Sequence, residues 1–338
     1  MSRRFDVAEL IDGVRGGDRV ALARSITLVE SRKPEHRKLA RQMLRELAGS
    51  SGNSIRLGLS GVPGAGKSTF TDALGCRLID QGHRVAVLAV DPSSSVSGGS
   101  VLGDRTRMGI LSQSDDAFIR PSPTGLHLGG VARATREAML LVEAAGYDVV
   151  IVETVGVGQS EVAVAGMVDT YLVLMLARSG DQLQGIKKGI LELAHVIAVN
   201  KADGENAAEA RVTARDLSIA MKLVSSQANE RRVPVLTCSA LEKSGLDEVW
   251  QAVLDHRVHL EKTYGLAKYR GAQQVSWMWS QTEAAVLDSL HGTREMRELA
   301  HRMEEAVDSG ETSALDASSE LLRVFAAQVP SLDWAQPD

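Results

Sequence analysis

The feature that most constrains this chain is the eight-residue segment 61–68, which reads GVPGAGKS. It fits G-x-x-x-x-G-K-[ST], the pattern of a loop that binds the phosphates of a nucleotide. A short apolar run at 55–60, typical of a buried parallel strand, precedes the segment, and apolar residues at helical spacing follow it over 69–79. A strand before the loop and a helix after it distinguish this motif from a chance match, so the sequence predicts a nucleotide-binding site here.

The residue types of the loop fit phosphate chemistry. Backbone N–H groups must curl around phosphate oxygens, and glycine permits the unusual backbone angles that this requires. The helix that follows adds partial positive charge at its first turn. We expect the Lys67 ammonium to reach the β- and γ-phosphates and the Ser68 hydroxyl to bind Mg²⁺. The residues predicted to hold the phosphates are Gly61, Gly64, Ala65, Gly66, Lys67, Ser68 and Thr69.

Three acidic residues near strand ends are candidate catalytic groups and Mg²⁺ ligands. Asp91 follows the strand-like run 84–90, and Glu153 ends another at 147–152. The carboxyl ends of parallel strands are where such sheets bind their ligands. Asp104 lies in the Ser/Gly-rich segment after Asp91. The alternatives are a turn at Asp91 and a helix cap at Asp104. The spacing of Gly156 from Glu153 matches the glycine that contacts the γ-phosphate in switch GTPases.

The motif NKAD at 200–203 predicts which base the site reads. The Asp203 carboxylate can accept two hydrogen bonds from guanine, and adenine offers no such donor pair, so a polar pocket discriminates strongly between them. We expect Asn200 to brace the loop and the Lys201 stem to cover the purine. Backbone N–H groups at Ser239 and Ala240 are predicted to reach guanine O6. The expected substrate and product are therefore GTP and GDP.

The remaining pattern predicts the architecture. Residues 5–48 carry apolar side chains at helical spacing, with Pro34 opening a helix, and the polar run 48–53 predicts a linker. From residue 54 strands and helices alternate, which indicates a mainly parallel sheet with helices on both faces. We predict an α/β P-loop NTPase fold with helical extensions at both ends, divided into residues 1–52, 53–263 and 264–338.

Composition narrows the cellular context. The net charge is −5, which does not suggest a nucleic-acid binder. The two cysteines, Cys76 and Cys238, lie far apart in the sequence, and we expect both to be reduced. The first residues show no apolar leader, and no run approaches the roughly 18 apolar residues of a membrane span. We therefore expect a cytoplasmic protein that binds neither nucleic acid nor membrane.

Three features leave alternatives open. Lys187 and Lys188 lie beside glycines between a strand and a helix. Either they reach a nucleotide or a partner, or they form an ordinary surface pair. His256 and His259 share one helix face but lack a third ligand, so we expect surface residues. The helices after Gly271 are too few and too polar for an independent core. They pack on the nucleotide domain or form a dimer arm, and we favour a homodimer.

Together these motifs resemble the MeaB/MMAA family of P-loop GTPases, whose sequences also carry an older label as ArgK-type lysine/arginine/ornithine transport kinases. The resemblance covers nearly the whole chain. The segments that carry it are 61–68, 91–94, 98–108, 153–161, 180–189 and 200–203.

This resemblance implies a GTPase chaperone of adenosylcobalamin-dependent methylmalonyl-CoA mutase that works as a nucleotide-dependent dimer. It implies that Asp91, Asp104 and Glu153 surround Mg²⁺ and the reacting phosphate. It also implies that 156–161 is a second switch, and that 180–189 is a third that signals to the mutase through Lys187. The GTP and GDP states would then gate cobalamin loading and protect the mutase.

We expect hydrolysis by positioning and charge stabilisation, without a covalent intermediate. Turnover of the isolated protein should be slow, because the sequence shows no obvious arginine finger or well-placed glutamine. Three alternatives are a metal-insertion GTPase, a transport-associated kinase and a binding module that does not hydrolyse GTP. The isolated positions of Cys76 and Cys238 argue against the first.

Overall fold

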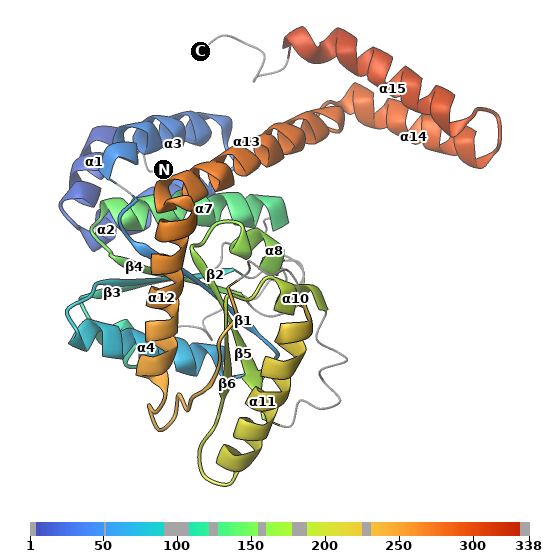
Figure 1. Ribbon diagram of the computed structural model, residues 1–338. Coiled ribbons are helices and arrows are strands. Elements are labelled where there is room, and N and C mark those ends of the chain that lie inside the picture. Colours follow the sequence, from blue (N-terminus) through green and yellow to red (C-terminus); the bar gives the residue numbers. More distant parts are fainter. Residues whose placement is uncertain are drawn as a thin grey trace. The chain divides into compact units, whose positions relative to one another are not determined.

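The computed structural model describes residues 5–50, 52–90, 108–121, 128–154, 160–177, 188–224 and 231–331. The chain divides into two compact units, Met1–Arg270 and Gly271–Asp338. The first unit contains the sheet, with helices around it (Figure 1). No helix in the described ranges is long and apolar enough to cross a membrane. The sequence-based division at 52/53 and 263/264 stays a prediction.

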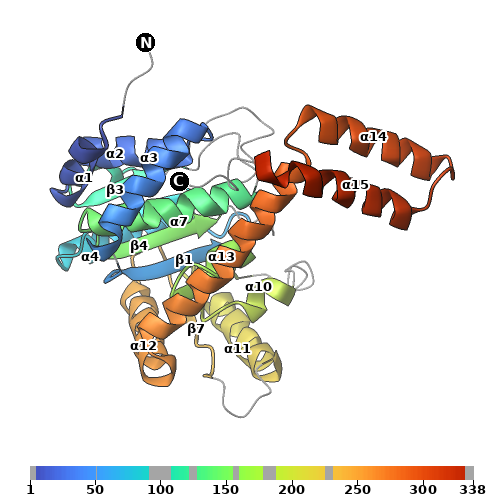
Figure 2. The ribbon, with the colours of Figure 1, turned by 90° about the horizontal axis from the view of Figure 1, so that it is seen from above.

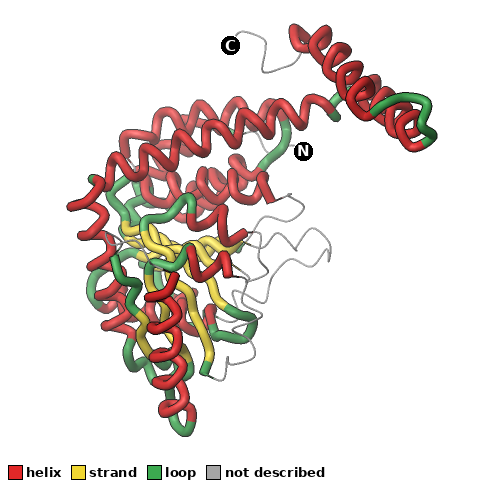
Figure 3. The backbone as a smooth tube through the Cα atoms, turned by 45° about the vertical axis from the view of Figure 1, so that its right-hand side comes forward, coloured by secondary structure: helices red, strands yellow, loops and turns green. Residues whose placement is uncertain are grey.

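Seven strands, all paired in parallel, form the centre of the first unit (Figure 3). Their order across the sheet is β3-β2-β4-β1-β5-β6-β7. This arrangement confirms the predicted parallel α/β sheet. The strands are β1 (Ile55–Gly61), β2 (Val85–Val90), β3 (Ala117–Arg120), β4 (Val149–Thr154), β5 (Thr170–Leu176), β6 (Val196–Asn200) and β7 (Val235–Thr237).

Each face of the sheet has its own hydrophobic core, because successive side chains of a strand point to opposite faces. On β2, Ala86 and Leu88 join one core, and Val85 and Val87 join the other. Helices therefore cover both faces (Figure 2). The first core takes side chains from α1 (Val7–Arg15), α2 (Arg19–Glu30), α3 (Pro34–Leu47), α7 (Leu128–Ala144), α8 (Ser160–Ala165) and α11 (Asn206–Val224). The second takes them from α4 (Lys67–Asp80), the short η2 (Leu111–Gln113) and α12 (Leu246–Tyr264).

The N-terminal helices are fixed by caps and by one buried ion pair. Asp18 caps α2, because its carboxylate accepts the backbone N–H of Val20 at 2.7 Å. Pro34 is the first residue of α3, as predicted. Arg37 of α3 donates to both carboxylate oxygens of Glu137 on α7, at 2.9 and 2.7 Å. These helices therefore pack on the sheet through α7, and the short η1 (Ala48–Ser50) leads from them towards β1.

A buried ionic cluster lies at the amino edge of the sheet. Arg56 of β1 donates to both carboxylate oxygens of Glu143 on α7, at 2.7 and 2.8 Å. Its backbone N–H donates to Asp169 at 3.1 Å. Arg270 donates to the same Asp169 at 2.8 and 2.6 Å and to the Ser54 carbonyl at 2.6 Å. The cluster thus joins the segment before β1, the segment before β5, α7 and the first turns of the helix that contains Arg270.

That helix is α13 (Leu266–Leu290), and most of it belongs to the second unit. It begins directly after Gly265, which ends α12 at φ 74°. The other helices of this unit are α14 (Arg294–Asp308) and α15 (Ala314–Gln328), followed by η3 (Val329–Ser331). Thr293 and Ser313 cap α14 and α15, and their buried apolar side chains are Met296, Leu299, Ala317 and Phe325.

The prediction that His256 is a surface residue is wrong. His256 is 5% exposed, and its ring stacks on His195 with ring centroids 4.2 Å apart. Its Nδ1 lies 2.9 Å from the hydroxyl of Thr170 on β5. Helix α12 packs with this residue turned towards the sheet, and His259, one turn later, is only partly buried.

Replacing Arg270 by leucine should destabilise the sheet-containing unit. The change leaves the Asp169 carboxylate buried without its guanidinium, and breaking a buried pair in this way costs about 3–5 kcal/mol. Urea unfolding monitored by circular dichroism measures the loss. The control is Arg77→Leu, which breaks the exposed Arg77–Asp247 pair and should leave the transition unchanged. An Arg270→Leu protein that unfolds at the parent's urea concentration would show that the cluster does not stabilise the fold.

Candidate nucleotide-binding site

The phosphate-loop segment joins β1 to α4, and its backbone leaves no room for side chains at two glycines. A Cβ at Gly61 would lie 2.3 Å from the Leu174 carbonyl oxygen on β5. Gly66 precedes α4 with φ 83°, and a Cβ there would lie 3.0 Å from the side chain of Asn200. Gly64 also has positive φ, at 79°, in open space. Glycine is thus required by backbone angle at all three positions, and by close approach at Gly61 and Gly66.

Lys67, the first residue of α4, folds back across the loop. Its ammonium donates to the Gly61 carbonyl at 3.0 Å. Burial lowers the pKa of Lys67 below its ordinary value, and the nearby carboxylates of Glu153 and Glu161 offset part of that shift. The lysine is therefore a partly buried cation held beside the loop, as expected for a group that binds phosphate.

Glu153 lies beneath the start of α4. It sits on β4 between Leu59 of β1 and Ala89 of β2, and it is 8% exposed. The Ser68 hydroxyl donates to one of its oxygens at 3.1 Å, and the Thr71 hydroxyl donates to the other at 3.0 Å. Sequence reasoning missed Thr71. Its position three residues after Ser68, on the same face of the helix, was the available signal.

The oxygen atoms around Ser68 suit a magnesium ion. A hydroxyl and a carboxylate are hard donors, which Mg²⁺ prefers. The Ser68 hydroxyl and Glu153 carboxylate lie within hydrogen-bond distance of one another, so both can face one ion. In the ranges that the structure describes, no group of three or more His, Cys, Asp or Glu side chains forms a metal site. The complete predicted ligand set therefore stays a prediction.

Asn200, the last residue of β6, links two parts of the site. Its amide N–H donates to the Ala65 carbonyl in the phosphate loop at 2.8 Å. Its side-chain oxygen accepts the backbone N–H of Ala240 at 3.0 Å. Asn200 is 1% exposed, so these bonds are made away from water. One side chain thus holds the phosphate loop at a fixed distance from the segment predicted to read the base.

The Asp203 carboxylate is oriented by a neighbour. The Ser239 hydroxyl donates to it and accepts the backbone N–H of Glu242 at 3.0 Å. Lys201 lies between Asn200 and Asp203 along the chain with φ 59°, an angle that few residues other than glycine adopt. The bent backbone at Lys201 brings Asp203 back towards Ser239. The structure therefore gathers the predicted base-reading residues at the carboxyl ends of β6 and β7.

Four predicted site residues lie outside the described ranges, namely Asp91, Asp104, Gly156 and Lys187. Strands β2 and β4 end at Val90 and Thr154. Lys188, the first residue of α10 (Lys188–Glu192), follows Lys187 directly.

Comparisons with known proteins agree with this geometry. Residues 22–295 match the family described as methylmalonyl-CoA mutase-associated GTPase MeaB. A probable GTPase of Mycobacterium tuberculosis is 54% identical over 315 residues, covering 93% of this chain and 94% of that protein. The mouse protein named methylmalonic aciduria type A homolog, mitochondrial, is 43% identical over 333 residues, covering 96% and 80%. A crystal structure of a protein named LAO/AO transport system kinase superposes with a TM-score of 0.76, at 41% identity, covering 95% and 97%.

We expect Lys67→Ala to abolish GTP turnover. The substitution removes the side-chain ammonium predicted to contact the phosphates, and loss of one such electrostatic group costs at least about 100-fold in rate. Phosphate release from GTP measures the effect. Lys222→Ala removes an exposed lysine of α11 and serves as the control. Unchanged hydrolysis by the Lys67→Ala protein would reject this loop as the reaction site.

Proposed function

Because this chain belongs to the MeaB family of GTPases, we propose that it is a chaperone of an adenosylcobalamin-dependent methylmalonyl-CoA mutase or a related acyl-CoA mutase. The chain binds guanine nucleotide and hydrolyses GTP. In the proposed role, its GTP and GDP states gate loading of the cobalamin cofactor and protect the mutase from inactivation. The observation that carries this proposal is the family match over residues 22–295.

At the phosphate end, the proposed mechanism is positioning and charge stabilisation. The loop backbone and the Lys67 ammonium would bind the β- and γ-phosphates. Ser68 and Glu153, with Asp91 and Asp104, would hold Mg²⁺, which supplies positive charge against the phosphate oxygens when bound. Thr71 would keep the Glu153 carboxylate directed at Ser68, since it donates to the second oxygen. Gly156 would approach the γ-phosphate.

At the base end, Asp203 would accept two hydrogen bonds from guanine. Its bond from Ser239 fixes the carboxylate before the base arrives, which reduces the ordering that binding requires. Backbone N–H groups near Ser239 and Ala240 would bind guanine O6, and the Lys201 stem would cover the ring. The bonds from Asn200 to Ala65 and Ala240 support this proposal, because they set the span between phosphates and base.

The signal to the mutase would pass through the segment that contains Lys187. In this proposal, the segment 180–189 responds to the nucleotide state, and Lys187 is the residue that reports it to the mutase. Hydrolysis by the chain alone would be slow, and contact with the mutase would accelerate it. Such a signal is a shift in the populations of two conformations. The GTP and GDP states must therefore bind the mutase with different affinities.

We also propose that the second unit forms a homodimer. Three large apolar residues on one face of α13, namely Val275, Met278 and Trp279, are each more than half exposed. An exposed apolar face of this kind marks an interaction surface, and a second copy of the same helix is the partner we favour. The cytoplasm is the proposed compartment. The free thiols of Cys76 and Cys238 are consistent with a reducing environment.

The alternative of a transport-associated kinase rests on the name of the solved protein that superposes on this chain. Such an enzyme would transfer the γ-phosphate to a protein, and labelled phosphate on a partner would reveal it. The alternative of a metal-insertion GTPase receives no support from the described ranges, where no cluster of metal-binding side chains occurs.

Asp203→Asn should move the base preference from guanine towards xanthine. The new side-chain amide donates a hydrogen bond where a carboxylate oxygen accepted one. It meets the exocyclic amine of guanine, which is also a donor, whereas xanthine offers a carbonyl oxygen at the same position. We expect the affinity ratio of GDP to xanthosine diphosphate to fall by at least about 100-fold in competition binding. The control is Glu205→Gln, an exposed carboxylate two residues away. An unaltered ratio would remove Asp203 from the base pocket.

The client is tested by copurification from a cell extract. The full chain is loaded with GDP or with a non-hydrolysable GTP analogue, and captured proteins are identified by mass spectrometry. We expect a cobalamin-dependent mutase, recovered in different amounts in the two states. The Lys67→Ala protein should lose that difference, because its phosphate contact is weakened. Equal recovery of a mutase in both states, or of none, would contradict the proposed gating.

A further inference from the structure

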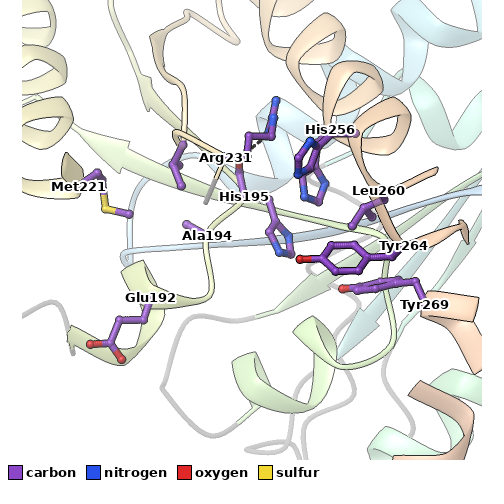
Figure 4. Close-up of a pocket in the computed structure, with 11 residues that line it drawn as sticks. Glu192, Ala194, His195, Met221, Arg231, His256, Leu260, Tyr264 and Tyr269 are labelled. Atoms are coloured by element: carbon purple, nitrogen blue, oxygen red, sulfur yellow. Dashed lines mark hydrogen bonds between the residues drawn. The ribbon is translucent and has the colours of Figure 1, made fainter. Parts of the chain in front are cut away.

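A cavity of about 610 Å³ lies in the first unit, at the edge of the sheet opposite the nucleotide loop. His195 lines it directly before β6 begins, whereas Asn200 of the nucleotide site ends the same strand. Its walls come from the end of α10, from α11, from the last turns of α12 and from the start of α13 (Figure 4). The proposed chaperone function assigns no role to this cavity.

His195 presents a hydrogen-bond donor in a fixed orientation. The backbone N–H of Tyr171 donates to its Nδ1 at 2.9 Å. An N–H group can only donate, so Nδ1 carries no proton and the neutral ring has its proton on Nε2. Burial, with a smaller effect from Arg231, lowers the pKa of His195 to about 4. Charging the ring would also break the bond from Tyr171, so His195 stays neutral.

His256 is neutral for a related reason. Burial lowers its pKa to about 3, and the nearby His195, Arg231 and His259 act in the same sense. The stacked rings of His195 and His256 therefore form an uncharged aromatic surface. A metal ion does not explain them, since the described ranges contain no group of three possible metal-binding side chains.

Aromatic and polar groups complete the cavity. Tyr264 is 59% exposed at the end of α12, and Tyr269 follows on α13. Figure 4 shows both hydroxyl groups directed towards the side where Glu192 lies. Arg231 is held by bonds to the carbonyls of His195 and Ala252, at 3.3 and 3.4 Å. The formal charges of Arg231 and Glu192 cancel, which favours a neutral ligand.

We propose that this cavity binds a small, flat, uncharged heteroaromatic molecule with hydrogen-bond acceptors along its edge. The exposed ring of Tyr264 offers a stacking surface beside the His195 ring. The Nε2–H of His195 and the hydroxyl of Tyr264 offer donors at the rim. The volume falls within the range of roughly 300–1,000 Å³ that holds such ligands. Binding here is separate from binding of guanine nucleotide.

Caffeine is the probe, because it is flat, neutral and purely an acceptor. It lacks the N–H pair that Asp203 would need, and saturating GDP blocks the nucleotide site. Calorimetry on the GDP-bound full chain should give a dissociation constant in the millimolar range or lower. About 14 non-hydrogen atoms at ordinary ligand efficiency give an affinity of this order.

Tyr264→Ala should weaken caffeine binding by about tenfold, the usual effect of removing one stacking ring. His301→Ala removes an exposed aromatic ring on α14 that does not line the cavity, and it should change the affinity less than twofold. The absence of binding at about 10 mM caffeine, or full binding by Tyr264→Ala, would overturn the proposal. If Tyr264→Ala fails to fold, the NMR chemical shifts of the histidine Cε1–H protons in the parent protein test the proposal instead. Caffeine must move those of His195 and His256, and shifts confined to other histidines would also overturn it.

Discussion

The side chain of Asn200 is the contact on which the nucleotide site depends. It binds the phosphate loop through Ala65 and the segment predicted to read the base through Ala240, and it is buried. These segments lie 135 and 40 residues from Asn200 in the sequence. The parallel sheet makes the contact possible, because it brings the carboxyl ends of β1, β6 and β7 to the same edge. In the proposed site a guanine nucleotide spans the two segments, so this one amide would fix the length of the site.

The rest of the fold holds β1 in place beneath this site. Glu153 of β4 ties the first turn of α4 to the sheet through Ser68 and Thr71. At the opposite edge, the ionic cluster of Arg56 and Asp169 fixes the start of the strand. The cavity around His195 lies at that same edge. Strand β6 therefore has a neutral, ring-lined cavity at one end and the residues predicted to read guanine at the other.

Local motifs explain what could be predicted from the sequence. The alternation of strands and helices after residue 54 predicts the parallel sheet, and the NKAD motif predicts the bracing role of Asn200. Contacts that depend on packing could not be foreseen. Thr71 shares a helix face with Ser68, but its contact with Glu153 depends on how α4 packs on β4, and Arg270 meets Asp169 across 101 residues. The burial of His256 depends on how α12 turns against β5. The roles of Asp91, Asp104, Gly156 and Lys187 stay predictions, because these residues lie outside the described ranges.

We infer that one guanine nucleotide occupies the span between the phosphate loop and Asp203, which Asn200 joins. A crystal structure of the full chain with GDP and Mg²⁺ tests it most directly. We expect the β-phosphate within the loop beside Lys67, the ion beside Ser68, and two hydrogen bonds from guanine to Asp203. Density for the purine at any other place, or a phosphate loop without the nucleotide at saturating GDP, would contradict it.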